Sequence, residues 1–503
     1  MSAEPGSVLM LQGTASSVGK SLLTAALCRI LAREGLRVAP FKAQNMSNNS
    51  FVTADGRELG RAQAVQAEAA GIEPLAEMNP ILLKPEADHR SQVVVLGRPC
   101  GVLHGHDFLT RKQELWPVVT ESLARLRADF DVVLIEGAGS PAEINLRAGD
   151  IVNMRVARHA QAPVLLVGDI DRGGVFAHLV GTLALLEPEE RELVQGLVIN
   201  KFRGSAELLQ PGVAWLERRT GLPVAGVVPW LDGVGVADED AVALEGRREQ
   251  KRAALDVAVI RFPRIANFDD LDPLAAETGV SVRFVSEVSA FGTPNLLVLP
   301  GTKSTIADLD WLRRSGLAAA VLAHAEAGGA VIGICGGYQM LGERVLDPGR
   351  VESEAGEAPG LALLPAVTEF EPAKATHRVR ATLSCDHGLF ALLNGAEVGG
   401  YEIHMGQSRS AVPALHIRSR SGVPCDDADG AVNAAGNVFG TYLHGLFDND
   451  NLRATLLRSL SGAGEAEAFA PSVWDRRAAY NRLADHVAAA LDMRLVHRLL
   501  RLG

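Results

Sequence analysis

The sequence predicts an α/β protein with two doubly wound domains and a helical C-terminal tail. Apolar runs of strand length alternate with amphipathic helical patterns in both halves of the 503 residues, as is typical of parallel sheets covered by helices on both faces. A glycine-rich loop follows the first apolar run. In the second half, a cysteine flanked by glycines stands between an apolar run and a helical pattern.

The same order of elements occurs in each half. The first half begins with an apolar run at 8–12 and a helical pattern at 21–34, and the second half begins with an apolar run at 256–260. The further runs of strand length are 131–135, 162–167, 196–199, 282–285, 296–299, 330–334 and 437–442. Each half therefore predicts a mainly parallel sheet of its own.

The length of the chain also indicates more than one domain, because a domain usually holds about 100–200 residues. Charged residues gather at 245–252, which indicates a solvated linker. We therefore expect one domain over residues 1–250 and a second over 251–450. Leu and Ala recur at helical spacing over 451–503, which predicts the helical tail.

Composition and charge narrow the class of protein. Apolar residues make up 47% and charged residues 22% of the chain, which is typical of a globular protein. The net charge of -11 argues against a general affinity for nucleic acid and favours a small-molecule substrate. The N-terminus lacks the basic region of a secretory signal, and the most apolar stretch, 317–335, is interrupted by His324 and Glu326. We expect a cytoplasmic protein with no membrane or nucleic-acid partner; nothing in the sequence indicates its oligomeric state.

The glycine-rich loop predicts a phosphate-binding site. It follows the apolar run at 8–11 and precedes a helical pattern, so its backbone N–H groups can face phosphate oxygens at a helix N-terminus. Lysine in such a loop supplies positive charge, and the hydroxyl after it suits Mg²⁺. Thr14 stands where the usual pattern has its first glycine. The candidate ATP ligands are Gly13, Thr14, Ser17, Gly19, Lys20 and Ser21.

An acidic residue is placed to complete this site. Glu136 follows directly after the apolar run at 131–135. Ligands of open α/β sheets bind beyond the carboxyl ends of the strands, so Glu136 could reach a Mg²⁺ ion held near Ser21. The sequence therefore predicts ATP as a co-substrate together with Mg²⁺.

The glycine-flanked cysteine predicts a nucleophile. Cys335 follows the run at 330–334 and precedes a helical pattern, a position in which the helix N-terminus lowers a thiol pKa and backbone N–H groups face an oxyanion. A thiol nucleophile needs a base, and His444 in Gly-Thr-Tyr-Leu-His-Gly is the better candidate. His404 is the rival candidate.

These motifs resemble two known families. The first loop resembles that of dethiobiotin synthetase-like phosphate-loop enzymes. The turn at Cys335, with Gly337, Gln339 and the late His444, resembles class I glutamine amidotransferases over about residues 256–450. That resemblance implies that Gln339 helps to hold glutamine and that Gly301 and Gly336 form the oxyanion hole. Many members have glutamate two residues after the histidine, but this chain has Leu446, so the third triad member is absent from its usual place.

Further segments resemble the cobyric acid synthase family across essentially the whole chain. They are residues 39–50 with their Gln-Asn-Met-Ser sequence, 83–85, 91–97, and the Asp-Arg-Gly-Gly turn within 169–174. The polar side chains after the second strand suit carboxylate and amide groups of a corrinoid. The candidates are Lys42, Gln44, Asn45 and Asn48.

The resemblance implies a carbon–nitrogen ligase of cobalamin biosynthesis with glutamine as amido donor. Such enzymes amidate four peripheral carboxylates (b, d, e and g) of adenosylcobyrinic acid a,c-diamide to give adenosylcobyric acid. One alternative is the sibling enzyme, cobyrinic acid a,c-diamide synthase, which shares both domains. Another is a partition-type ATPase switch with an inactive glutaminase module, although that group carries a second lysine where this chain has Ala15.

Overall fold

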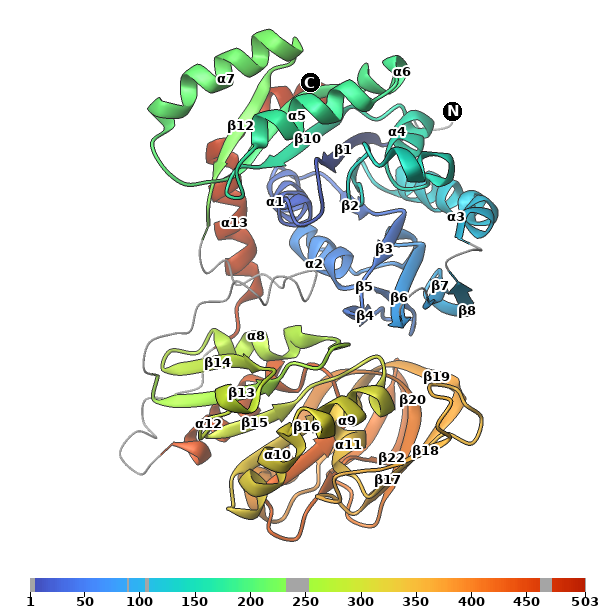
Figure 1. Ribbon diagram of the computed structural model, residues 1–503, viewed down its shortest axis with the longest axis vertical. Coiled ribbons are helices and arrows are strands. Elements are labelled where there is room, and N and C mark those ends of the chain that lie inside the picture. Colours follow the sequence, from blue (N-terminus) through green and yellow to red (C-terminus); the bar gives the residue numbers. More distant parts are fainter. Residues whose placement is uncertain (1–4, 88–89, 105–107, 232–252, 462–472, 503) are drawn as a thin grey trace.

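The structure is a computed structural model that describes residues 5–87, 90–104, 108–231, 253–461 and 473–502. Figure 1 shows two bodies stacked along the long axis, the first half of the chain above and most of the second half below. Each body contains a six-stranded sheet, so the predicted α/β class is confirmed. The expected boundary near residue 250 lies outside the described residues.

The sheet of the first half is fully parallel, with strand order β12-β11-β10-β1-β9-β2. Its strands are β1 (Ser7–Gly13), β2 (Val38–Phe41), β9 (Val132–Glu136), β10 (Val164–Asp169), β11 (Val194–Phe202) and β12 (Val224–Pro229). The first-half helices are α1 (Lys20–Arg33), α2 (Arg61–Ala70), α3 (Phe108–Asp129), α4 (Met154–Ala160), α5 (Val175–Leu185), α6 (Pro188–Arg191) and α7 (Ala206–Thr220). Alternate β1 residues, such as Leu9 and Met10, enter different apolar cores, so the sheet is buried on both faces.

Between β2 and β9 the chain forms small elements that the sequence analysis did not predict. They are a sheet of β3 (Gln44–Met46), β6 (Ile81–Ala87), β7 (Arg90–Val95) and β8 (Arg98–His104), and a hairpin of β4 (Ser50–Val52) and β5 (Glu58–Gly60). In Figure 1 these strands lie at the lower edge of the first body and face the second body. This insertion therefore supplies much of the surface on which the second half docks.

The second half contains a sheet of order β14-β13-β15-β16-β24-β23, parallel except for β23. Its strands are β13 (Leu255–Ile260), β14 (Val280–Val285), β15 (Leu296–Leu299), β16 (Ala330–Ile334), β23 (Ala431–Val432) and β24 (Val438–Thr441). Its helices are α8 (Asp272–Ala275), α9 (Thr305–Arg314), α10 (Leu317–Glu326), α11 (Gly336–Leu341) and α12 (Asp450–Leu460). The predicted strand runs of this half all lie in this sheet.

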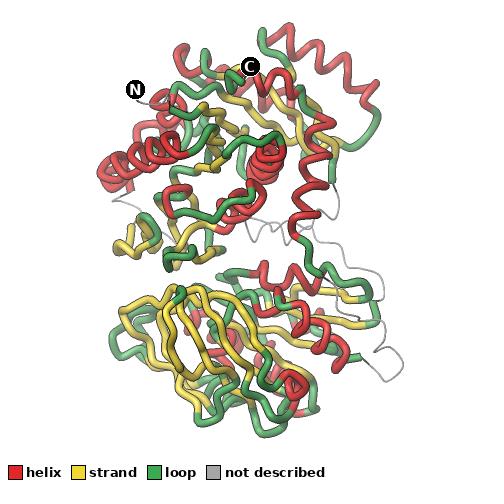
Figure 2. Tube along the Cα trace, turned by 180° about the vertical axis from the view of Figure 1, so that it is seen from behind, coloured by secondary structure: helices red, strands yellow, loops and turns green. Residues whose placement is uncertain are grey.

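Between α11 and β23 the expected alternation of strand and helix fails. The chain forms a mainly antiparallel sheet instead, whose long strands β19 and β20 pair along most of their length. Its strands are β17 (Arg344–Leu346), β18 (Glu357–Pro359), β19 (Ala366–Leu383), β20 (Glu397–Ser410), β21 (Leu415–Arg420) and β22 (Val423–Asp429). Figure 2 shows this sheet as the group of yellow strands below the first body.

The helical tail divides between the two bodies. Helix α12 packs into the core of the second half, whereas α13 (Arg476–Ala490) and α14 (Met493–Leu499) pack against α1 in the core of the first half. Figure 2 shows α13 running along the first body toward the second. The tail therefore belongs to both halves and ties them together.

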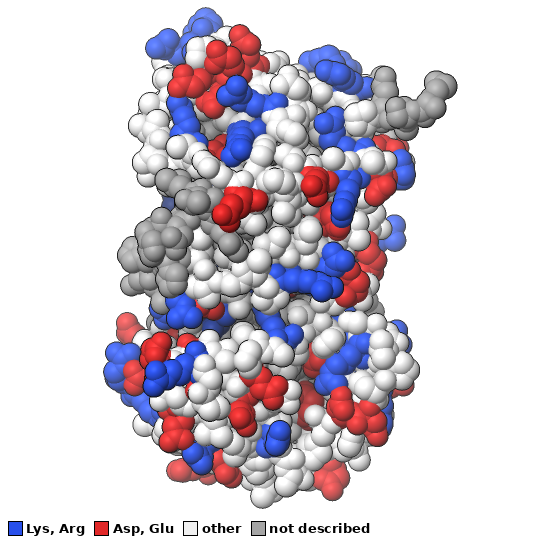
Figure 3. All heavy atoms as spheres, turned by 90° about the vertical axis from the view of Figure 1, so that its right-hand side faces the viewer, with Lys and Arg blue, Asp and Glu red and all other residues white. Residues whose placement is uncertain are grey.

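Basic and acidic side chains are interspersed over the face shown in Figure 3. In the described part of the chain, no helix combines the length and the apolar character needed to cross a bilayer.

We predict that Gly226→Val loosens the C-terminal helices from the first half. A Cβ atom on Gly226 would lie 2.3 Å from the Ala490 carbonyl oxygen, and Asp492 N–H donates to the Ala225 carbonyl beside it. Overpacking of this kind costs about 1–3 kcal/mol. The expected result is a lower melting temperature and faster proteolysis of α13 and α14. Gly181→Val, where a Cβ meets no atom within 4 Å and φ is not positive, is the comparison variant; an equal effect of both would contradict the prediction.

Candidate active sites

The first site lies where β1 turns into α1. Gly19 has φ +99°, a left-handed conformation that favours glycine, and Lys20 begins the helix. The Lys20 ammonium donates to the carbonyl oxygens of Ala15 (2.9 Å) and Gly139 (3.2 Å), so it folds back over the loop. The loop thus presents N–H groups and a cation at a helix N-terminus, an arrangement that binds phosphate.

The predicted acid lies beside this loop. Glu136, fully buried at the end of β9, accepts hydrogen bonds from the Ser21 hydroxyl (2.9 Å) and from the Gln66 amide (2.6 Å). Its other contact is a buried ion pair with Lys42 at 2.8 Å. Lys42, which we expected at the corrinoid, therefore lies at the nucleotide site in this structure.

The oxygens of this site suit Mg²⁺. The described residues contain no group of three or more His, Cys, Asp or Glu that could hold a metal alone. Mg²⁺ at phosphate sites usually takes only one or two protein oxygens and completes its shell with water and phosphate. Ser21 and Glu136, in direct contact, offer such a pair.

The other residues predicted to bind the corrinoid are buried or half-buried. Gln44 and Asn45 lie in the short strand β3 and not in the loop that we expected; they are 7% and 2% exposed, respectively. Asn48 is half-buried, and its side-chain oxygen has no hydrogen-bond partner among the described residues. The structure therefore leaves their assignment to the corrinoid as a prediction.

Two residues of the nucleotide site were missed. Asn200 and Lys201, in β11, donate hydrogen bonds to the loop carbonyls of Val18 (2.8 Å) and Ser17 (2.7 Å). Lys201 also pairs with Asp169 at 2.9 Å. The sequence feature that could have indicated these two residues is the Asn-Lys pair directly after the apolar run at 196–199.

The second site lies at the turn from β16 to α11. Cys335 adopts φ 52° and ψ -111°, a backbone conformation rare for a non-glycine residue, and its N–H donates to Thr441 (2.8 Å). A Cβ on Gly337 would lie 1.9 Å from the Leu299 carbonyl oxygen, so only glycine fits there. The tight turn places the sulfur of Cys335 at the N-terminus of α11.

His444, three residues after β24, lines the same pocket as this sulfur. Its Nδ1 lies 2.7 Å from Asp270 Oδ2. Burial alone would lower the pKa of His444, but the charge and hydrogen bond of Asp270, with a smaller contribution from Cys335, raise it to about 10. A charged imidazole beside sulfur stabilises a thiolate.

Asp270 corrects the expectation that the acid of the triad is missing. Its carboxylate also accepts the N–H of Gly445 (2.8 Å), so it fixes both the imidazole and the backbone beside it. Asp270 lies in the short helix η5 (Phe268–Leu271), 174 residues before His444 in sequence. The acid thus comes from another segment, so the usual glutamate position can be occupied by Leu446.

His404, the rival base, has other partners. Its Nδ1 lies 2.6 Å from the Gly406 carbonyl, and its ring stacks on Tyr442 with centroids 3.7 Å apart. The ring of His404 thus lines the pocket without a hydrogen bond to Cys335 among those of the described residues. The carbonyl oxygen of the neighbouring Ile403 accepts a hydrogen bond from the Cys335 thiol at 3.7 Å.

The remaining predicted residues surround the sulfur. Gly301 packs so closely on His444 that a Cβ atom would lie 3.1 Å from the imidazole Cε1, and Gly336 is the first residue of α11. The Gln339 side chain is held by Thr305 (2.8 Å) and Tyr442 (3.0 Å). Gly301 and Gln339 line one pocket together with Cys335.

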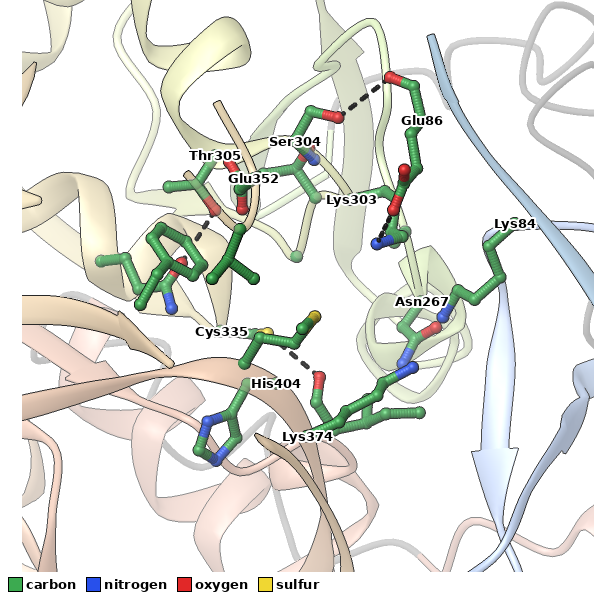
Figure 4. Close-up of a pocket in the computed structure, with 18 of the residues that line it drawn as sticks. Lys84, Glu86, Asn267, Lys303, Ser304, Thr305, Cys335, Glu352, Lys374 and His404 are labelled. Atoms are coloured by element: carbon green, nitrogen blue, oxygen red, sulfur yellow. Dashed lines mark hydrogen bonds and ion pairs between the residues drawn. The ribbon is translucent and has the colours of Figure 1, made fainter. Parts of the chain in front are cut away.

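This pocket crosses from one half of the chain to the other. Figure 4 shows Lys84 and Glu86, from the first half, on the side opposite Cys335. Lys303 pairs with Glu86 at 2.9 Å, and Glu58 pairs with both Lys84 and Lys374. The cysteine site thus opens onto a wall supplied by the phosphate-loop half.

Comparison with known proteins is consistent with both sites. Residues 9–243 match the family model of the CobQ/CobB/MinD/ParA nucleotide binding domain, and residues 256–452 match that of the CobB/CobQ-like glutamine amidotransferase domain. Cobyric acid synthase from Sorangium cellulosum is 55% identical over 98% of both chains. Those from Chloroflexus aurantiacus and Dehalococcoides mccartyi (strain CBDB1) are 54% and 50% identical over 98% and 99% of this chain, and each alignment covers 99% of the relative.

We predict that Asp270→Asn lowers glutamine hydrolysis by at least about 10-fold, because an acid that orients a catalytic histidine contributes up to about 10⁴-fold. Loss of the carboxylate charge also lowers the His444 pKa from about 10. The imidazolium then deprotonates at lower pH, so the alkaline limb of the pH–rate profile moves to lower pH. Glutamate release across pH measures both effects. Asp310→Asn, whose side chain lies on the exposed face of α9, should match the unaltered enzyme; an unchanged profile for Asp270→Asn would contradict the assigned role.

Proposed function

The chain belongs to the cobyric acid synthase family, and on that premise we propose that it amidates the b, d, e and g carboxylates of adenosylcobyrinic acid a,c-diamide to give adenosylcobyric acid. ATP activates the carboxylates and glutamine supplies the nitrogen. The observation that carries this proposal is the pocket at Cys335, whose opposite wall comes from the ATP-binding half. Nitrogen released at the sulfur therefore starts beside the half that uses it.

The second half performs the glutaminase reaction. The Cys335 thiolate attacks the side-chain amide carbon of glutamine, and N–H groups at Gly301 and Gly336 stabilise the oxyanion. His444, kept charged by Asp270, gives its proton to the leaving nitrogen, so ammonia departs and a thioester remains. His444 then takes a proton from water, which hydrolyses the thioester to glutamate and restores the thiol.

The first half performs the ligase reaction. A substrate carboxylate oxygen attacks the γ-phosphorus of ATP, which forms an acyl phosphate and releases ADP. Lys20 and the loop N–H groups stabilise the phosphate charge. Mg²⁺ bound at Ser21 and Glu136 would neutralise further charge on the phosphates. Ammonia then attacks the acyl carbon, the amide forms and inorganic phosphate leaves.

The proposed corrinoid site lies on the first half, near Gln44, Asn45 and Asn48. These amides lie in the inserted elements between β2 and β9, on the side of the nucleotide site that faces the second half. Amide groups can hydrogen-bond both to carboxylates that await reaction and to amides already formed. The proposed place of action is the cytoplasm, where ATP and glutamine are available.

The overall function can be tested by comparing two corrinoids as substrates. Purified enzyme with ATP, Mg²⁺ and glutamine should add four amide groups to adenosylcobyrinic acid a,c-diamide, as read by mass spectrometry, and should leave cobyrinic acid itself largely unchanged. Addition of two amides to cobyrinic acid would indicate the sibling a,c-diamide synthase. ATP hydrolysis without amidation of either corrinoid would favour the ATPase switch.

Two variants can test whether the second half performs the glutaminase reaction and the first half the ligase reaction. Cys335→Ala should abolish glutamate release but retain amidation when ammonium chloride replaces glutamine, because the ligase site is intact. Lys20→Ala should lose amidation by about 10²-fold or more with either nitrogen source, since a charge-stabilising group for the transferred phosphate is removed. Amide formation is counted by mass for both variants. Failure of ammonia to rescue Cys335→Ala, or normal synthesis by Lys20→Ala, would contradict the assignment.

A further inference from the structure

An arginine from the ATP-binding half reaches the glutaminase triad. Arg61, the first residue of α2, lies with its Nε 2.9 Å from Asp269 Oδ2. Both side chains are almost fully buried, at 3% and 5% exposure. The contact lacks hydrogen-bond geometry at Nε, so it is an ion pair held by charge. Asp269 directly precedes Asp270, the acid that orients His444.

Arg61 stays protonated in this position. Burial opposes it, but the charge of Asp269, with those of Glu68 and other neighbours, raises the pKa of Arg61 well above its usual value. Attraction between two buried charges is strong, and loss of one partner leaves the other uncompensated. Without Arg61, the adjacent buried carboxylates of Asp269 and Asp270 would keep only Arg476 and His444 as nearby positive groups among the described residues.

The segment that carries both acids is bound to the first half at a second point. Asn267 N–H donates to the Asn49 side-chain oxygen (2.7 Å), and Ser50 N–H donates to the Asn267 side-chain oxygen (3.0 Å). Asn267 has φ 52°, a strained conformation that this reciprocal pair of bonds holds in place. The position of η5 is therefore held from the first half as well as by Phe268 and Leu271, which are buried in the core of the glutaminase half.

From these contacts we propose that Arg61 is a positioning residue of the glutaminase: by pairing with Asp269 it holds Asp270 in line with His444. The proposal rests on the proposed glutaminase function of Cys335. Arg61 itself touches neither the cysteine pocket nor, through any contact among the described residues, the phosphate loop. Its effect should therefore fall on proton transfer by His444, not on the binding of glutamine or ATP.

The test uses full-length Arg61→Gln and the double variant Arg61→Gln/Asp269→Asn. Arg61→Gln should lower the kcat of glutamate release by about 10-fold or more and leave KM for glutamine within about 2-fold, because only the triad is disturbed. Ammonia-dependent amidation should persist in the same preparation. The double variant removes both charges of the pair and should recover most of the lost kcat.

The matched control is Arg283→Gln. Arg283, in the second half, pairs with Asp256 at 2.8 Å between neighbouring strands and has no contact with η5 among those of the described residues, so this change should leave glutaminase kcat unaltered. Equal losses of glutamine- and ammonia-dependent synthesis in Arg61→Gln, an unchanged kcat, or no recovery in the double variant would overturn the proposal. Failure of the proposed function itself would appear separately, as no glutamate release by the unaltered enzyme.

Discussion

The contact between η5 and the first half is the constraint on which the cysteine site depends. Asp270 aligns His444 only while η5 keeps its place, and Asn49, Ser50 and Arg61 of the other half hold the segment that carries it. The same contact closes the cysteine pocket against Lys84 and Glu86. Docking of the two halves thus helps to position the acid of the triad and also completes the pocket in which ammonia is released.

Helix α2 gives this constraint a physical link to the nucleotide. Arg61 at its first turn pairs with Asp269, and Gln66 on the same short helix donates to Glu136 beside the phosphate loop. Ten residues of helix form a rigid element of about 15 Å. Helix α2 therefore contacts both the acid beside the phosphate loop and the segment that carries the acid of the glutaminase triad.

The residues that sequence could identify are those with a local pattern. Glu136 and Cys335 each stand at the end of an apolar strand, and Lys20 closes the glycine-rich loop that follows another, so the local pattern alone indicates a role. Asp270 has no such pattern, because its partner lies 174 residues later and η5 is a single short turn. The antiparallel pair β19 and β20 was missed for a related reason. Its residues are partly exposed and irregular in burial, so the period of a strand is weak.

The charge of the cysteine pocket suits the nitrogen that it releases. Glu58 is one carboxylate shared by two buried ammonium groups, Lys84 and Lys374, so this wall keeps a positive excess. Burial, with repulsion from Lys84 and Lys303, lowers the pKa of Lys374 to about 8 despite the attraction of Glu58. Positive groups repel a cation, so Lys84 and Lys374 do not retain nitrogen as ammonium. Neutral ammonia, the form that can attack an acyl phosphate, is not repelled by them.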